Sequence, residues 1–147
     1  MHLIAASVYV VVLSADSVLL LRRSNTGLHD GFFSLPGGKH DGGESLARAA
    51  ARELFEETGL IVDESTLKFG HLLHSQDADG TEWMGAFFIA ESWSGEPRLM
   101  EPHKHDALEW HSVDSLPQNL AESIHQVLMA LKNNIAFSCF GWKKTSG

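Results

Sequence analysis

The chain has 147 residues, of which 44% are hydrophobic and 20% charged, with a formal net charge of −8. This composition is typical of one globular domain over residues 1–147, not of a disordered chain. The excess of Asp and Glu disfavours a broad basic surface for nucleic acid. The single cysteine, Cys139, excludes an internal disulfide and a multi-cysteine zinc site; we expect an inert thiol that is buried or only partly exposed.

The apolar segment 3–13 superficially resembles a secretion signal. No Lys or Arg precedes it, and the apolar pattern resumes at Val18 after a turn, so we expect a strand there instead. No apolar run approaches the roughly 20 residues that a membrane-spanning helix requires. We therefore predict a soluble, cytoplasmic protein without membrane contact.

The N-terminal third predicts two strands and a long loop. Residues 4–13 are apolar on both alternating faces, which is typical of a central strand covered on both sides. Residues 18–21 predict a second strand that forms a hairpin with the first. Segment 24–43 contains six glycines and predicts a long loop, which in a compact domain usually has a function.

Residues 45–58 predict the clearest helix of the chain. The segment is rich in Ala, Leu and Glu, and Gly59 follows as a stop signal. Leu46, Ala50 and Leu54 recur every four residues and mark the expected buried face.

The second half of the chain predicts three more strands and a last helix. The strands are expected at 67–75, 83–92 and 108–111, and the turn at 77–80 joins the first two as a hairpin. The helix is expected at 119–133, where apolar residues recur at helical spacing. Strands and helices together indicate an α+β protein.

Three glutamates share one face of the helix predicted at 45–58. Glu53, Glu56 and Glu57 are spaced i, i+3 and i+4, which places their side chains together. Like charges at this spacing repel, and a hard divalent cation bound by carboxylate oxygens would offset that repulsion. A solvated acidic face is the alternative. The glycine backbone at 37–38 and the neighbouring Arg52 favour the metal site.

These residues belong to a longer pattern of fixed spacing. Gly38 is followed after five residues by Glu44, and after seven more by the run 52–60 (RELFEETGL). Every fixed position of the Nudix box is filled, so the chain resembles the Nudix hydrolase family. The resemblance implies the Nudix fold, an α+β architecture with a mixed β-sheet sandwiched between α-helices.

The resemblance also implies roles for single residues. The three glutamates and the carbonyl of Gly38 would ligate Mg²⁺ or Mn²⁺. Arg52 would orient a glutamate, and Glu44 would support the geometry between loop and helix. The base that activates water would be a glutamate of the box or a carboxylate of a later loop, for which Glu101 is the candidate.

Further residues are candidates for contact with the substrate, and these are Arg23, Gly37, Gly38 and Lys39. Four histidines, His71, His74, His103 and His105, are not expected to bind the metal, because oxygen ligands suit Mg²⁺ better than imidazole. We expect them to be polar surface residues, with contact to a substrate phosphate as the alternative for His103 and His105.

The implied reaction is hydrolysis of a pyrophosphate bond in a nucleoside diphosphate derivative. No proline lies between Leu60 and Glu96, and Tyr9 is the only tyrosine. Markers typical of ADP-ribose and dinucleoside polyphosphate hydrolases are therefore missing. The chain is most similar to MutT-like enzymes, which cleave a nucleoside triphosphate to the monophosphate and pyrophosphate. The alternatives are hydrolysis of ADP-ribose or a nucleotide sugar, and a non-enzymatic nucleotide-sensing module. The expected partners are a small nucleotide and, as in many family members, a second copy of the chain.

Overall fold

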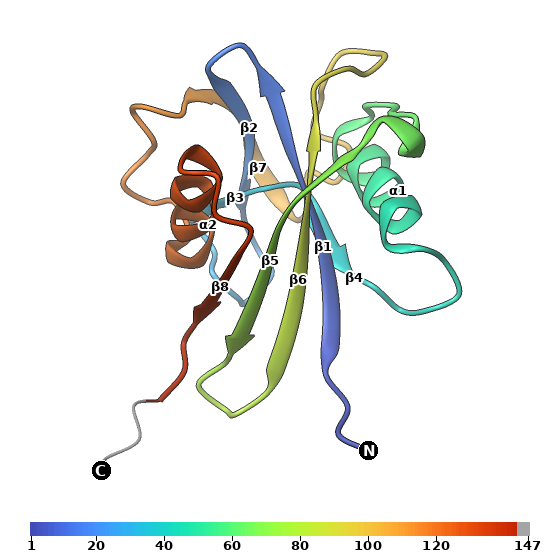
Figure 1. Ribbon diagram of the computed structural model, residues 1–147. Helices are drawn as coiled ribbons and strands as arrows, with labels where there is room; N and C mark the ends of the chain where they lie inside the picture. The colour runs from blue at the N-terminus through green and yellow to red at the C-terminus, as the bar shows by residue number, and fades with distance from the viewer. Residues whose placement is uncertain (144–147) are drawn as a thin grey trace.

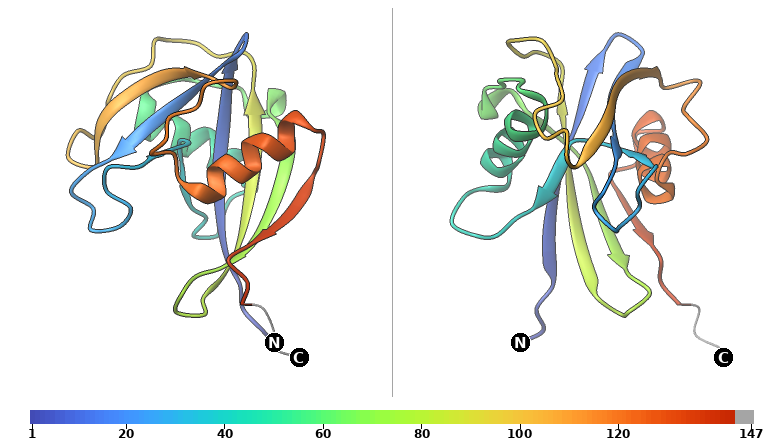
Figure 2. Two further views of the ribbon diagram at one scale, coloured as in Figure 1. Left: turned by 90° about the vertical axis from the view of Figure 1, so that its left-hand side faces the viewer. Right: turned by 180° about the vertical axis from the view of Figure 1, so that it is seen from behind.

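The computed structural model describes residues 1–143, in which two helices cover opposite faces of one mixed sheet. Helix α1 (Leu46–Thr58) lies on one face and helix α2 (Glu122–Lys132) on the other (Figure 1). Figure 2 shows the same layers from the side and from behind. The predicted α+β architecture is confirmed. No helix within residues 1–143 is long and apolar enough to cross a membrane.

Strand β1 (Ala5–Ser14) is the centre of the sheet. It forms the predicted hairpin with β2 (Ser17–Arg23) and pairs in parallel with β6 (Glu82–Ala90). Its N-terminal half also pairs antiparallel with β4 (Gly37–Lys39). Residues 38 and 8 are partners in that register, so the glycine segment is held directly against the central strand.

The remaining strands extend the sheet on both sides. Beyond β6, strand β5 (Lys68–Gln76) pairs antiparallel with β6 and in parallel with β8 (Phe137–Phe140). Strand β2 carries β3 (Phe33–Ser34) and β7 (His105–Ser112), both antiparallel. The sheet therefore combines parallel and antiparallel pairs, as predicted.

Two apolar cores lie on the two faces of the sheet. Val8 and Val10 of β1 pack on the α1 side with Leu54, whereas Val11 packs on the α2 side with Leu128. Successive side chains of a strand point to opposite faces, so a strand between two helical layers must be apolar on both. The prediction of a doubly covered first strand is confirmed.

Several predicted ends of strands and helices are wrong, because backbone pairing with residues far away in the sequence sets where these elements begin. The sequence predicts a loop at 24–43, but β3 and β4 lie within it, paired with β2 and β1. Strand β7 begins at residue 105, not 108, because β2 provides hydrogen-bonding partners along its whole length. Helix α2 begins at residue 122, not 119, because Phe33 exchanges backbone hydrogen bonds with Asn119 and Ala121.

The structure also differs from the sequence-based predictions in two short elements and in the exposure of two side chains. Strand β8 and a short 3₁₀ helix at Glu64–Thr66 are not predicted from the sequence. Leu46 is expected on the buried face of α1 but is 40% exposed, because it is the first residue of the helix. The thiol of Cys139 is exposed on β8, not buried or partly exposed.

Candidate active site

Helix α1 is fixed at both ends and along one face. The Ser45 side chain accepts a hydrogen bond from Arg48 N at 3.2 Å, which caps the first turn. Gly59 ends the helix at a φ of 78°, and its N–H donates to Phe55 O at 2.9 Å. Leu54 is fully buried against the sheet. The neighbouring carboxylates are therefore held at defined positions relative to β4.

The backbone of β4 lies directly against two of the three glutamates. Gly37 N donates a hydrogen bond to Glu57 Oε2 at 3.2 Å. A Cβ atom at Gly38 would lie 2.7 Å from the carboxyl carbon of Glu53. Only glycine permits this approach at position 38, so the paired glycines and the helical carboxylates form one site.

Arg52 connects three carboxylates around this site. Its Nη2 donates to Glu44 Oε1 at 2.7 Å, and its Nη1 lies 3.2 Å from Glu53 Oε1 and 3.3 Å from Glu56 Oε2. The guanidinium holds the pKa of Glu44 below its usual range. Arg52 thus ties the loop that carries Glu44 to the helix that carries the glutamates.

Burial makes the negative charge of this site unfavourable. Glu57 is only 8% exposed, and burial raises its pKa to about 8, although the Gly37 N–H partly opposes the shift. Burial and then the charge of Glu56 raise the pKa of Glu53. One buried and one partly buried carboxylate, both with raised pKa values, form an environment that a bound cation would stabilise.

The oxygen atoms at this site are of the kind that binds a hard divalent cation, but in the present structure they do not surround one common point. Carboxylate and backbone carbonyl oxygens are the ligands that Mg²⁺ and Mn²⁺ prefer. Within residues 1–143, no three His, Cys, Asp or Glu side chains surround a point where a metal could sit. Glu56 contacts Arg52, and its side chain is 49% exposed, which leaves it room to change rotamer.

The segment after β6 brings Glu101 to the same end of α1. Arg98 N donates to Thr58 O at 2.9 Å, and Met100 N donates to Glu57 O at 3.4 Å. The negative charge of Glu101 raises the pKa values of both Glu53 and Glu57, so its carboxylate lies within electrostatic reach of them. The carboxylate of Glu101 therefore lies within electrostatic range of Glu53 and Glu57 on helix α1.

The two candidate cations for substrate binding lie in different places. The charge of Arg23 is a minor influence that lowers the pKa of Glu57, and the Arg23 Nε donates a hydrogen bond to Leu28 O at 2.9 Å. Lys39 follows Gly38 on β4, and its ammonium lies over the ring of Trp83 at 5.7 Å. Because side chains alternate along a strand, Lys39 lies on the face opposite to Gly38 and Glu53. Arg23 is thus within electrostatic range of Glu57 but does not contact it, and Lys39 lies on the other face.

Two of the four histidines are buried, which corrects the expectation of surface residues. His71 is fully buried, donates from Nδ1 to Ile135 O at 2.8 Å, and has Ser138 Oγ 2.8 Å from Nε2. It links β5 to the segment that forms β8. His105 is 6% exposed at the start of β7, opposite Arg23. Its position beside the site is not apparent from the sequence, because the pairing with β2 creates it.

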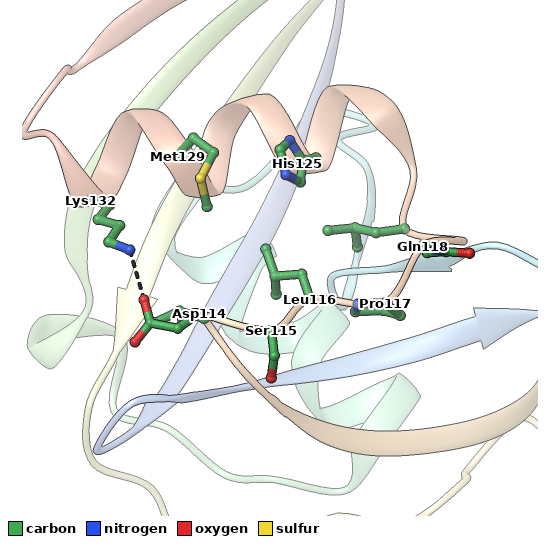
Figure 3. Close-up of a pocket in the computed structure, with 10 residues that line it drawn as sticks. Asp114, Ser115, Leu116, Pro117, Gln118, His125, Met129 and Lys132 are labelled. Carbon is green, nitrogen blue, oxygen red and sulfur yellow. Dashed lines mark hydrogen bonds and ion pairs between the residues drawn. The ribbon is translucent and has the colours of Figure 1, made fainter.

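A separate pocket of about 480 Å³ lies between α2 and the segment before it (Figure 3). His125, Met129 and Lys132 line it from α2, and Lys132 Nζ forms an ion pair with Asp114 at 2.7 Å. None of its lining residues belongs to the group around Glu57. The pocket therefore does not define the site, which the carboxylates and the β4 backbone define instead.

Known proteins share both the sequence pattern and this fold. A model of the NUDIX domain matches residues 3–131. An uncharacterized Nudix hydrolase of Bacillus subtilis is 34% identical over 75% of this chain and 66% of its own length. A putative 8-oxo-dGTP diphosphatase of the same organism is 36% identical over 56% of this chain and 64% of its own length. The chain thus spans slightly less than two thirds of each relative.

One solved structure has the same fold as this chain over nearly its whole length. A MutT NUDIX hydrolase from Burkholderia pseudomallei superimposes with a TM-score of 0.80 and 31% identity, covering 87% of this chain and 98% of that one. The family model, the shared fold and the site geometry lead to one conclusion. The chain belongs to the Nudix hydrolase family.

Proposed function

We propose that this protein is a divalent-metal-dependent pyrophosphohydrolase that converts a nucleoside triphosphate to the monophosphate and pyrophosphate. One observation carries the proposal: Glu53 and Glu57 converge on the backbone of Gly37 and Gly38 at a partly buried site. The name of the putative 8-oxo-dGTP diphosphatase supports a triphosphate as the substrate.

Each residue of the site has a distinct part in this reaction. Glu53, Glu56, Glu57 and the Gly38 carbonyl would hold Mg²⁺ or Mn²⁺. When bound, the cation neutralises the pyrophosphate oxygens and acidifies water. Arg52 keeps its glutamate partners in place. Arg23 offers a guanidinium to a phosphate oxygen, and Glu101 takes the proton of the attacking water.

A substrate panel tests this proposal. We expect pyrophosphate release from canonical or oxidised nucleoside triphosphates with Mg²⁺ or Mn²⁺, its loss on chelation and its return when the metal is restored. Glu56→Gln should lose most of this activity, whereas Glu64→Gln, an exposed glutamate outside the site, should retain it. Turnover of ADP-ribose or a nucleotide sugar alone would contradict the triphosphate assignment. Nucleotide binding without any turnover would indicate a sensor.

Arg52→Lys provides a second test. Lysine keeps the positive charge but lacks the planar fork that contacts three carboxylates at once. We expect kcat to fall roughly tenfold to hundredfold, measured at saturating Mg²⁺. The control is Arg48→Lys, an exposed residue one turn earlier in α1. An unchanged kcat in Arg52→Lys would show that the carboxylates keep their positions without the guanidinium.

A further inference from the structure

Arg23 is held by the protein at one of its three guanidinium nitrogens. Its Nε donates a hydrogen bond to Leu28 O at 2.9 Å. Neither terminal amino group of Arg23 donates a hydrogen bond or forms an ion pair within residues 1–143. Such amino groups contact phosphate oxygens, and a guanidinium binds them best when its planar fork is already oriented. The bond to Leu28 therefore decides in which direction Arg23 presents its amino groups.

The backbone beside Arg23 is fixed next to the proposed site. Ser24 N donates to Lys104 O at 2.8 Å, and Lys104 N donates to Glu101 O at 2.9 Å. The end of β2 thus lies against the turn that begins at Glu101, the proposed base. The charge of Arg23 also acts weakly on Glu57, where it lowers the pKa. Backbone contact and charge together place Arg23 at the edge of the site.

Loop 24–31 is closed at its base. Arg23 N donates to Phe32 O at 3.0 Å, and Gly31 N donates to Arg23 O at 2.7 Å. Asn119 Nδ2 donates to Gly31 O at 2.8 Å, which attaches the loop to the segment before α2. The two ends of the loop are therefore fixed, and the position of its middle depends on contacts inside the loop.

Asp30 is the centre of the contacts inside this loop. Its carboxylate accepts hydrogen bonds from Gly27 N at 2.9 Å, Thr26 N at 3.1 Å and Thr26 Oγ1 at 2.6 Å. These donors, the Thr26 hydroxyl above all, hold the pKa of Asp30 below its usual range. Thr26 Oγ1 in turn accepts a hydrogen bond from Leu28 N at 3.2 Å. Asp30 thus acts through Thr26 on the residue that holds Arg23.

The Thr26 hydroxyl leaves the Leu28 carbonyl to Arg23. Thr26 Oγ1 lies 2.9 Å from Leu28 O and 2.6 Å from Asp30 Oδ1, but a hydroxyl has only one proton to donate. The charged oxygen at the shorter distance is the stronger acceptor. Arg23 Nε is then the donor that satisfies Leu28 O. Without Asp30, the hydroxyl would turn to Leu28 O and compete with Arg23.

The loop needs these contacts because part of its backbone is unfavourable. Asn25 and His29 have φ values of 57° and 55°, in the left-handed region that residues with a side chain rarely adopt. Asn25 directly precedes Thr26, and His29 directly precedes Asp30. The hydrogen bonds of Asp30 therefore hold a conformation that the chain would otherwise leave.

We propose that Asp30 is a positioning residue: it keeps loop 24–31 in the shape in which Arg23 presents its terminal amino groups to a phosphate oxygen of the nucleoside triphosphate. This inference rests on the proposed function, because it concerns the substrate of that reaction. Asp30 itself does not touch the substrate. Its negative charge alone would repel a triphosphate, so positioning and charge predict opposite changes in KM when Asp30 is replaced.

Two substitutions at position 30 separate positioning from charge. Asp30→Ala removes the acceptor and the charge, whereas Asp30→Asn removes the charge and keeps one acceptor oxygen. We expect Asp30→Ala to raise KM about tenfold with kcat changed less than about twofold, and Asp30→Asn to reverse part of the rise. An unchanged or lowered KM in Asp30→Ala would overturn the proposal.

The matched control is Asp79→Ala at the tip of the β5–β6 hairpin. Asp79 is also an exposed aspartate that accepts a backbone hydrogen bond within its own turn, from Thr81 N at 2.9 Å. Its replacement removes the same charge away from Arg23, so KM should stay as in the wild type. An equal rise of KM in Asp79→Ala and Asp30→Ala would overturn the proposal, because the effect would not depend on loop 24–31.

A double-mutant cycle tests whether Asp30 acts through Arg23. Arg23→Gln should raise KM at least about tenfold, because charged hydrogen bonds to phosphate are lost. In that background, Asp30→Ala should change KM by less than about twofold. A further tenfold rise would overturn the proposal, because Asp30 would then act independently of the guanidinium.

A measurement on the metal-free protein does not depend on turnover. We expect NMR spectra of the wild type to show an Arg23 Nε–H proton that exchanges slowly with water, and this exchange to become fast in Asp30→Ala but not in Asp79→Ala. Fast exchange in the wild type, or equally slow exchange in Asp30→Ala, would overturn the proposal. A wild type that turns over no nucleotide but shows the Asp30-dependent protection would instead refute the proposed function alone.

Discussion

Glu57→Gln is expected to lower metal-dependent turnover about a thousandfold and to make the metal-free protein more stable. The substitution removes a proposed ligand of the cation, and metal ligation contributes several kcal/mol to such reactions. The Gln amide oxygen can still accept the hydrogen bond that Gly37 N gives to Glu57 Oε2. Turnover should therefore fall, whereas the free energy of unfolding of the metal-free protein should rise.

The gain in stability should depend on pH with a defined sign. The pKa of Glu57 rises from 4.5 to about 8 on folding. Its protonated form is therefore favoured in the folded state, and that contribution is fully present below pH 4.5 and is lost as pH rises toward 8. The difference between Glu57→Gln and wild type should grow by up to about 1.4 kcal/mol per pH unit in this window.

Urea denaturation in the presence of a chelator, repeated across the window, measures this difference. Glu64→Gln is the control, since Glu64 is exposed and lies outside the site. If the free energies of unfolding of wild type and Glu57→Gln change in parallel with pH, then folding does not raise the pKa of Glu57. Saturating Mg²⁺ should stabilise the wild type more than the variant.

Alanine at the two adjacent glycines should have two different effects. A Cβ at Gly37 would lie 2.3 Å from Val8 O, a backbone atom of the central strand that cannot move aside. We expect Gly37→Ala to lower the free energy of unfolding by about 3 kcal/mol or more. A Cβ at Gly38 instead meets the carboxylate of Glu53, the end of a flexible side chain. Gly38→Ala should fold but lose activity, about a hundredfold in kcat, because Glu53 is displaced.

Gly70→Ala is the matched control for both variants. Its Cβ would meet the ends of the Ile89 and Leu131 side chains at 3.0 Å, and these can shift. We expect a change in unfolding free energy of less than about 1 kcal/mol and normal turnover. Equal stability of Gly37→Ala and Gly70→Ala would contradict the close approach of β4 to β1. Normal kcat in Gly38→Ala would contradict the contact with Glu53.

Local patterns predict the part of the site that lies on one helix. The spacing of Glu53, Glu56 and Glu57, the stop at Gly59 and the contact between Arg52 and its neighbours all depend on residues a few positions apart. These features are confirmed by the geometry of α1. The metal-ligating role of the glutamates stays a prediction.

Long-range pairing creates the features that the sequence does not predict. β8 is four residues long and exists through its register with β5, far away in the chain. The burial of His71 and His105 has the same origin, since the α2–β8 connection and β2 cover them. Lys39 is adjacent to the glycines in sequence, but strand alternation places it on the other face.

The parallel pair of β1 with β6 sets an order of events during synthesis. The first strand ends at residue 14 and its central partner at residue 90. At ~5–20 residues per second, translation needs roughly 4–15 s to cover that interval, whereas a helix or a hairpin forms in microseconds. The edge of β1 that pairs with β6 therefore stays open for seconds, and the face of β1 that α2 covers stays open until residue 132 is made. A nascent chain of this protein should bind chaperones through its valine-rich first strand until both β6 and α2 have left the ribosome.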